Sequence, residues 1–254
     1  MRTRMLATVT AAALLTLVFP SAAQANHSWG GYHWARTANP FTLQLGDNVG
    51  SQWDSALRGA STDWSKSTVL DTTVVAGSTN PRNCKAVTGR VEVCNSTYGN
   101  NGWLGIAGIS ITGGTHITKG YVKLNDTYFN TPQYNTAAWR NLVTCQEVGH
   151  TFGLDHQDEN FNNANLGTCM DYTNDPSTNQ HPNQHDYDEL VIIYSHLDST
   201  STVGAAAAAS GPSAAGDSPA SWGQLVRGSR AYGHSIYVRD LGRGEAFVTF
   251  VTWA

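Results

Sequence analysis

Apolar residues recur along this chain with two different periods, which predict separate helices and strands. A spacing of three to four residues predicts amphipathic helices over residues 48–66, over 135–151 and from Asp186 to Leu197. Valine-rich runs with alternating polar positions are typical of half-buried strands. Such runs lie at residues 69–75, 90–93, 103–112 and 121–125.

The last part of the chain has a different pattern. Residues 199–221 are low-complexity Ala, Ser, Gly and Pro, which predicts a linker. Residues 222–254 alternate apolar and polar positions on both sides of Gly242-Arg243-Gly244. This pattern predicts a β hairpin, with a third strand near residues 222–226. So short a segment without a disulfide rarely folds alone, and we expect this small β-rich tail to pack against the main domain.

The first 25 residues have the three parts of a secretory signal peptide. Two arginines supply a positive start, an apolar stretch runs from Leu6 to Phe19, and Ala23-Gln24-Ala25 forms a small-residue cleavage site. The apolar stretch is shorter than the roughly 20 residues that span a bilayer, which argues against a membrane anchor. We expect residues 1–25 to be removed, residues 26–198 to form the main domain, and the protein to be secreted.

Charge and cysteine content narrow the classes of partner. Only 13% of the residues are charged and the formal net charge is −4. No basic stripe is available for a phosphate backbone, so we expect neither a nucleic-acid partner nor a membrane partner. Secretion favours disulfides, because they persist outside the cytosol. Cys84 and Cys94 flank a short loop and are expected to pair locally, which leaves Cys145 with Cys169.

The candidate chemistry is concentrated in residues 145–156, which read CQEVGHTFGLDH. Glu147 and His150 fall on the predicted helix. Gly153 permits a left-handed stop, and His156 follows on the outgoing turn. A zinc hydrolase needs imidazoles that converge on the metal and a carboxylate close to the metal-bound water. The residue types and their spacing fit that requirement.

This stretch resembles the metzincin signature HExxHxxGxxH, with Gln146 in the place of the first histidine. Further along, Met170 in the sequence Cys-Met-Asp-Tyr resembles the Met-turn that lies beneath the metal. Residues 50–197 are similar to a matrixin-like secreted metzincin of the actinobacterial type. The resemblance implies an α+β domain with a twisted mixed β-sheet, an active-site helix, a Met-turn and a C-terminal helix. It also implies a monomeric zinc-dependent endopeptidase that acts on a peptide or protein substrate.

The resemblance assigns roles to individual residues. It makes Glu147 the general base, and it makes His150 and His156 the Zn2+ ligands. Tyr172 matches a tyrosine that lies near the metal in some metzincins, where it stabilises the oxyanion, although a packed core tyrosine is an equal alternative. Strand 103–112 becomes an edge strand that binds extended substrate by strand addition. The residues expected on that edge are Gly105, Ile106, Ala107 and Gly108.

Position 146 leaves three possibilities open. In the first case the amide oxygen of Gln146 ligates zinc, although an amide is a poorer donor than imidazole. In the second case a further histidine completes the site, with His116, His181 and His185 as the candidates. In the third case the metal is lost, and the chain is an extracellular pseudo-protease that binds peptides or proteins.

Two smaller features also carry alternatives. The resemblance brings Cys145 and Cys169 together, so that a disulfide would join the ligand helix to the floor of the site. The alternative is a Cys145 thiolate that replaces the missing ligand. The acidic loop that follows the ligand helix is either solvated or holds a structural Ca2+ ion. Its oxygen-bearing residues are Asp155, Asp158, Glu159, Asn160 and Asn162.

Overall fold

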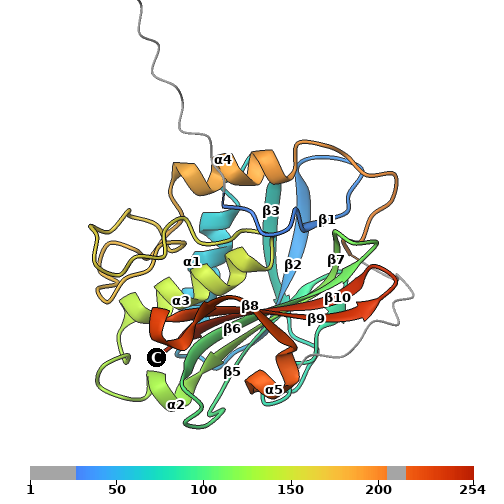
Figure 1. Ribbon diagram of the computed structural model, residues 1–254. Helices are drawn as coiled ribbons and strands as arrows, with labels where there is room; N and C mark the ends of the chain where they lie inside the picture. The colour runs from blue at the N-terminus through green and yellow to red at the C-terminus, as the bar shows by residue number, and fades with distance from the viewer. Residues whose placement is uncertain (1–26, 205–215) are drawn as a thin grey trace, which may run out of the picture.

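The computed structural model describes residues 27–204 and 216–254. The expected signal peptide, residues 1–25, and the middle of the expected linker lie outside the described residues. Within them, the strands form one mixed sheet in the order β3-β2-β5-β7-β6-β10-β9-β8, with β1 and β4 paired to β7 (Figure 1). The expected α+β fold with a mixed sheet is thereby confirmed. The strands are β1 His33–Trp34, β2 Phe41–Asn48, β3 Leu70–Ala76, β4 Val87–Thr88, β5 Val91–Ser96, β6 Trp103–Thr112, β7 His116–Asn125, β8 Gln224–Ser229, β9 His234–Gly242 and β10 Glu245–Trp253.

The three expected amphipathic helices are present and lie above the sheet in Figure 1. The sheet itself changes character along its width: β3, β2, β5 and β7 pair in parallel, whereas β6, β10, β9 and β8 pair antiparallel. No helix among the described residues is long and apolar enough to cross a bilayer. The helices are α1 Asp54–Trp64, α2 Asp126–Phe129, α3 Ala137–His150, α4 Gln184–Ile193 and α5 Pro219–Trp222, with a short 3-10 helix at Arg230–Tyr232.

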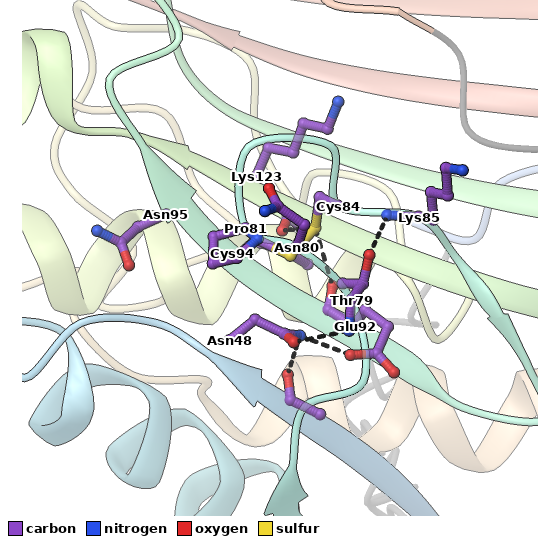
Figure 2. Close-up of a disulfide and its surroundings, with 12 residues drawn as sticks. Asn48, Thr79, Asn80, Pro81, Cys84, Lys85, Glu92, Cys94, Asn95 and Lys123 are labelled. Carbon is purple, nitrogen blue, oxygen red and sulfur yellow. Dashed lines mark hydrogen bonds between the residues drawn. A yellow bond between two sulfur atoms is a disulfide. The ribbon is translucent and has the colours of Figure 1, made fainter.

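Apolar side chains fill both faces of the sheet. The larger cluster lies between the sheet and the helices α1 and α3, and includes Trp53 and Trp64. The smaller cluster lies on the opposite face, where Trp222 of α5 packs near Tyr237. The Cys84–Cys94 disulfide belongs to this second cluster (Figure 2). Because both faces are covered, the central strands have near-continuous apolar sequences rather than strict alternation.

The tail is the main departure from the expected arrangement of the sheet. The strand β10 pairs antiparallel with β6 over nearly its whole length, with Phe250 opposite Ala107 and Thr252 opposite Gly105. The strand β6 is paired with β7 on its other side and is therefore not an edge strand. The expectation of an exposed edge is wrong for Gly105, Ile106, Ala107 and Gly108, all of which are buried between two neighbouring strands.

The physical reason lies in the composition of β10. Its residues Val248 and Phe250 are buried in the helix-side core, and Phe247 and Val251 are buried in the core on the other face. A strand that is apolar on both faces needs a central position, and an uncovered β6 would expose a row of unpaired backbone groups. Pairing β10 with β6 meets both requirements. The strand β2 at Phe41–Asn48 was not anticipated from the sequence and lies between β3 and β5.

Candidate metal and catalytic site

The helix α3 carries the candidate residues in its last two turns. Thr136 caps its first turn by accepting a hydrogen bond from the backbone N–H of Trp139. The helix ends at His150, and the chain then turns at Gly153, whose φ of +98° is in the left-handed region. A Cβ atom at Gly153 would also collide with the carbonyl oxygen of Tyr32. Glycine is therefore required for the turn that returns the chain to the helix end.

The turn brings two imidazoles together. The Nε2 atoms of His150 and His156 lie 3.0 Å apart in the buried interior. The Nδ1 of His150 is 2.9 Å from the carbonyl oxygen of Leu154, to which it donates, so its Nε2 keeps a lone pair. Burial lowers the pKa of both imidazoles well below the usual range, and the neighbouring imidazoles His156 and His234 add to the effect on His150 and His156 respectively. Both imidazoles are therefore neutral at neutral pH, which is the form that binds metals.

Glu147 is fully buried one helical turn before His150, and its carboxyl lies against β6. A Cβ atom on Gly105 would lie 2.5 Å from Oε1 of Glu147, so glycine leaves the space that the carboxyl fills. Burial raises the pKa of Glu147 to about 8. The Thr252 hydroxyl and the Ala107 backbone face the carboxyl and lower the pKa in part, although neither completes a hydrogen bond of ordinary geometry to either oxygen. A buried, poorly compensated carboxyl of this kind is a candidate proton carrier.

Gln146 has a partner at each end of its amide. Its Nε2 donates to the carbonyl oxygen of Cys169 at 2.9 Å, and its Oε1 accepts from the hydroxyl of Thr252 at 2.9 Å. In tetrahedral zinc sites the ligand atoms lie about 3.3 Å apart, so the two Nε2 atoms fit a shared zinc ion. The oxygen of Gln146 is occupied by the tail in this structure. It becomes available as a third donor only if Thr252 moves away.

The Met170 segment forms the floor beneath α3. The disulfide between Cys145 and Cys169 is present, as expected, and joins the helix to this segment. Met170 is fully buried, and a Cβ atom on Gly149 of the helix would lie 2.8 Å from its sulfur. The alternative weighed for Cys145, a thiolate that ligates zinc, is therefore wrong, because its sulfur is in a disulfide.

Tyr172 contacts the histidine pair directly. Its hydroxyl lies 2.7 Å from Nδ1 of His156, and the two rings lie 4.1 Å apart. Burial raises the pKa of the tyrosine well above its usual range, and Glu159 adds to that rise, so the hydroxyl keeps its proton. A neutral hydroxyl either donates to Nδ1 or accepts from Nδ1–H, and the tautomer of His156 decides which. The Tyr172 hydroxyl, which was expected to stabilise an oxyanion, thus contacts His156 in this structure and orients its ring.

The tail covers these residues. The ring of Phe250 stacks on His150 with centroids 4.5 Å apart and an interplanar angle of 5°. The ring of His234 in β9 stacks on Tyr172 at 4.6 Å. Sequence reasoning did not assign these residues to the site. The apolar alternation of residues 245–253 was a usable signal for a buried strand, but nothing in it specified the partner.

The other candidate ligands lie in separate contacts. His181 pairs with Asp63 at 2.6 Å, and the ring of His185 stacks on His27 at 5.0 Å. His116 lies near Asp198, at a different place in the fold. In the acidic loop, Arg227 of β8 bridges two carboxylates that were weighed as calcium ligands. Its guanidinium lies 2.5 Å from Asp155 and 2.9 Å from Glu159.

A cavity of about 630 Å³ opens beside the covered site. Gln146 and Tyr172 form one part of its wall, and Trp139 and Tyr134 supply aromatic surface. The tail contributes Thr252 and Trp253 among other residues. The cavity has the size of a small-molecule or side-chain pocket. Its position next to Gln146 places apolar binding surface beside the candidate chemistry.

No protein-family model and no curated protein matches this chain. Among solved structures, the chain is similar to high choriolytic enzyme 1, a hatching enzyme zinc-protease from Oryzias latipes (Medaka fish). The similarity covers 67% of this chain and 98% of that chain, with a TM-score of 0.35 and 11% sequence identity. A likeness of that size establishes neither the fold nor the activity of this protein.

Proposed function

We propose that this protein is a secreted zinc-dependent endopeptidase whose own tail strand covers the site in the structure. The observation that carries the proposal is the convergence of the Nε2 atoms of His150 and His156, 3.0 Å apart, with the buried carboxyl of Glu147 one turn earlier on the same helix. The two disulfides are compatible with an extracellular location. We also propose that the protein acts as a monomer on peptide or protein substrates.

The chain supplies the ligands and a base. His150 and His156 would hold the zinc ion, and the oxygen of Gln146 is the third donor once Thr252 has left it. Bound zinc would supply a Lewis acid that polarises a peptide carbonyl and lowers the pKa of water. Glu147 would accept a proton from the attacking water and pass it to the leaving amine. Opening the site to solvent reduces the burial that raises the pKa of Glu147, which favours the ionised base.

The pairing of β10 with β6 indicates how substrate would bind. An extended peptide in the place of β10 would pair with the backbone of Gly105, Ile106, Ala107 and Gly108. The side chain that replaces Thr252 would lie close to Gln146 and to the aromatic cavity. The tail is then a competitor of substrate, and displacement of β10 is a requirement for activity.

A specific cut in the linker tests this proposal. Residues 205–214 are replaced by the recognition sequence of a site-specific protease, and the cut chain is separated from its tail in moderate urea and refolded. The tail contains no cysteine, so no disulfide retains it. We expect casein hydrolysis to rise after removal of the tail, and a chelator or Glu147→Gln to abolish the gain.

The matched control carries a scrambled recognition sequence and keeps its tail. A folded, tail-free chain that binds zinc and still cleaves no peptide would contradict the peptidase proposal. Hydrolysis that survives both the chelator and Glu147→Gln would contradict the zinc mechanism.

One observation favours a second candidate, a metal-free peptide-binding protein. In the metal-free state the Tyr172 hydroxyl donates to Nδ1 of His156, and the Nε2–H of His156 points to Nε2 of His150. The Nδ1–H of His150 in turn donates to the oxygen of Leu154. This chain of hydrogen bonds satisfies both imidazoles without a metal, and Gln146 is satisfied as well. Metal analysis of the tail-free chain separates the candidates. A Gln146→His variant that gains zinc and activity where the parent has neither would favour the binding protein.

A further inference from the structure

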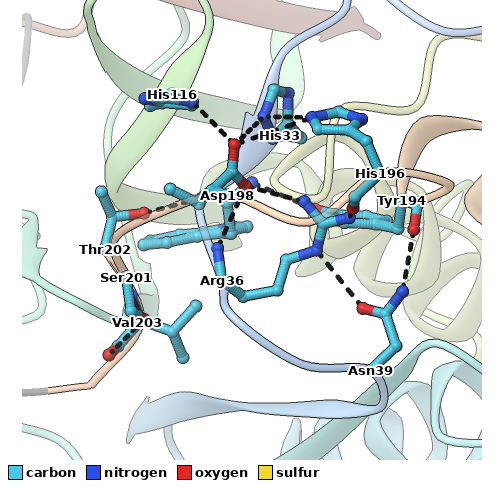
Figure 3. A network of polar contacts seen from close by, with 12 residues as sticks. His33, Arg36, Asn39, His116, Tyr194, His196, Asp198, Ser201, Thr202 and Val203 are labelled. Carbon is cyan, nitrogen blue, oxygen red and sulfur yellow. Dashed lines mark hydrogen bonds and ion pairs between the residues drawn. The ribbon is translucent and has the colours of Figure 1, made fainter.

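A second group of histidines lies away from the site described above, at the end of β7. His33 belongs to β1, His116 begins β7, and both His196 and Asp198 follow α4. His33 and His116 are direct partners in the parallel pairing of β1 with β7. Figure 3 shows all three imidazoles directed toward the carboxylate of Asp198. Segments far apart in the sequence thus place three potential ligands together, His33, His196 and Asp198, with His116 beside Asp198.

The atoms that face one another are the ones that bind metals. The Oδ1 of Asp198 lies 3.2 Å from Nε2 of His116, 3.5 Å from Nε2 of His33 and 3.7 Å from Nε2 of His196. The Nε2 atoms of His33 and His196 lie 3.1 Å apart. The ligand atoms of His33, His196 and Asp198 all lie within 4.8 Å of one another, and their separations are near the about 3.3 Å edge expected when N and O ligands lie about 2.0–2.1 Å from a tetrahedral zinc ion. His116 lies outside that group and contacts it through Asp198.

The orientation of the rings agrees with a shared metal ion. The ring of His33 is nearly perpendicular to that of His196, at 87°, and to that of His116, at 85°. His33 and His196 therefore approach Asp198 from different directions, whereas stacked rings would point their nitrogens side by side.

Groups behind the ligands fix them in this orientation. The Nδ1 of His33 is 2.8 Å from the carbonyl oxygen of Gly31, so Nδ1 carries the proton and Nε2 is free to bind. The Oδ2 of Asp198 accepts from the backbone N–H of Arg36 at 3.2 Å and from its guanidinium at 2.9 Å. Only Oδ1 is left to face the histidines.

Arg36 is itself held in place. Its side chain is almost fully buried, and its guanidinium lies over the ring of Tyr194 at 4.8 Å. It also donates to Asn39 and to the backbone oxygen of His196 (Figure 3). One buried arginine therefore positions both ligands that follow α4. Outer-shell support of this kind is typical of protein metal sites.

We propose that His33, His196 and Asp198 form a zinc site, with His116 as an outer-shell partner of Asp198. Two imidazoles and one carboxylate suit zinc better than calcium or magnesium, which prefer oxygen ligands. The ion would join the N-terminal strand to the segment after α4. The proposal shares no residue with the site around Glu147 and stands independently of the peptidase function.

The test compares two histidines that are both exposed and both contact a carboxylate. His196 is 52% exposed and lies in the cluster, whereas His181 is 63% exposed and contacts only Asp63 among carboxylates. Neither replacement by alanine opens a core cavity. Zinc per chain is measured by mass spectrometry in the full-length secreted protein, in His196→Ala and in His181→Ala. Cobalt(II) substitution then reports tetrahedral coordination through its visible absorption.

We expect His181→Ala to match the parent protein and His196→Ala to contain one zinc ion fewer. The affinity for zinc should fall by more than the about 10–100-fold that loss of an outer-shell partner causes. A chelator should lower the Tm of the parent and of His181→Ala, and should lower that of His196→Ala less. His116→Ala, which removes an outer-shell partner of Asp198, should lower the affinity for zinc by about 10–100-fold, less than His196→Ala.

Equal zinc content and equal cobalt spectra in all four proteins would overturn the proposal. So would a tetrahedral cobalt signal that persists unchanged in folded His196→Ala. Circular dichroism of each variant establishes that a loss of metal does not follow from a loss of fold.

Discussion

At the scale of single residues, Gln146 decides how the candidate site is read. A histidine at this position would present a nitrogen to a metal, whereas the glutamine divides its amide between the Cys169 carbonyl and the Thr252 hydroxyl. The amide therefore joins the floor of the site to the tail that covers it. The same residue stabilises the covered state and is the third donor proposed for the open state.

Replacement of Thr252 tests this link. Thr252→Val keeps the shape of the side chain and leaves the buried oxygen of Gln146 without its donor. We expect a loss of about 1–3 kcal/mol in the free energy of unfolding, measured by urea denaturation with disulfides intact. Thr252→Ser keeps the hydroxyl and should lose much less. Equal stability of the valine and serine variants would show that the hydrogen bond contributes nothing.

At the scale of elements, the C-terminal end of α1 holds the helix layer together. The indole of Trp64 donates to the oxygen of Cys145 in α3 at 3.1 Å, and the hydroxyl of Tyr187 in α4 donates to the oxygen of Asp63 at 2.8 Å. The carboxylate of Asp63 also accepts from Lys66 and contacts His181, each at 2.6 Å. This single helix end therefore fixes α3, and with it the candidate site.

The charge at Asp63 predicts a pH dependence. Burial by itself raises the pKa of Asp63, but hydrogen bonds and charges from Lys66 and His181 outweigh it and hold the pKa below 3.8. Stability from the ionised carboxylate is therefore complete above that value and is lost as the pH falls through the lowered pKa. We expect Asp63→Asn to lower Tm at neutral pH, with a gap that narrows at about pH 2.

Asp54→Asn, at a partly exposed carboxylate on the same helix, is the matched control and should leave Tm nearly unchanged at both pH values. A Tm gap for Asp63→Asn that stays constant with pH would contradict the ionic interpretation.

At the scale of the whole molecule, the tail is part of the sheet rather than an appendage. The strand β10 extends the sheet beyond β6, and β9 and β8 follow it. Arg227 of β8 then reaches over to Asp155 and Glu159, in the loop that leaves the histidine pair. The covered site thus depends on backbone pairing on one side and on an ion-pair network on the other.

Reversal of that charge is expected to loosen the tail. Arg227→Glu places a third carboxylate beside Asp155 and Glu159, and the side chain of Asp155 is almost fully buried. Amide hydrogen exchange in β8 should become faster, and to a smaller degree in β9. Arg239→Glu, an exposed position on β9, is the control and should leave exchange unchanged. Identical exchange in both variants would exclude a role for the Arg227 network in holding the tail.

Local sequence patterns were sufficient to predict much of the fold and of the candidate site. Periodicity predicted α1, α3, α4 and most strands, since a helix or a strand depends on the residues within it. Both disulfides were anticipated from cysteine spacing and secretion. The pairing of His150 with His156 follows from a helix end and a glycine turn within a few residues. Each of these features joins groups that are close in the sequence.

The tertiary structure decided which distant segments meet. Strand alternation specifies which side chains share a face but not which strand is the neighbour, so the pairing of β10 with β6 was not predictable. The partners of Gln146 and the cluster around Asp198 have the same origin. Sequence by itself thus determined the candidate chemistry of α3. The packing of the tail determined that this chemistry is covered, because long-range pairing alone satisfies the backbone of β6 and buries both faces of β10.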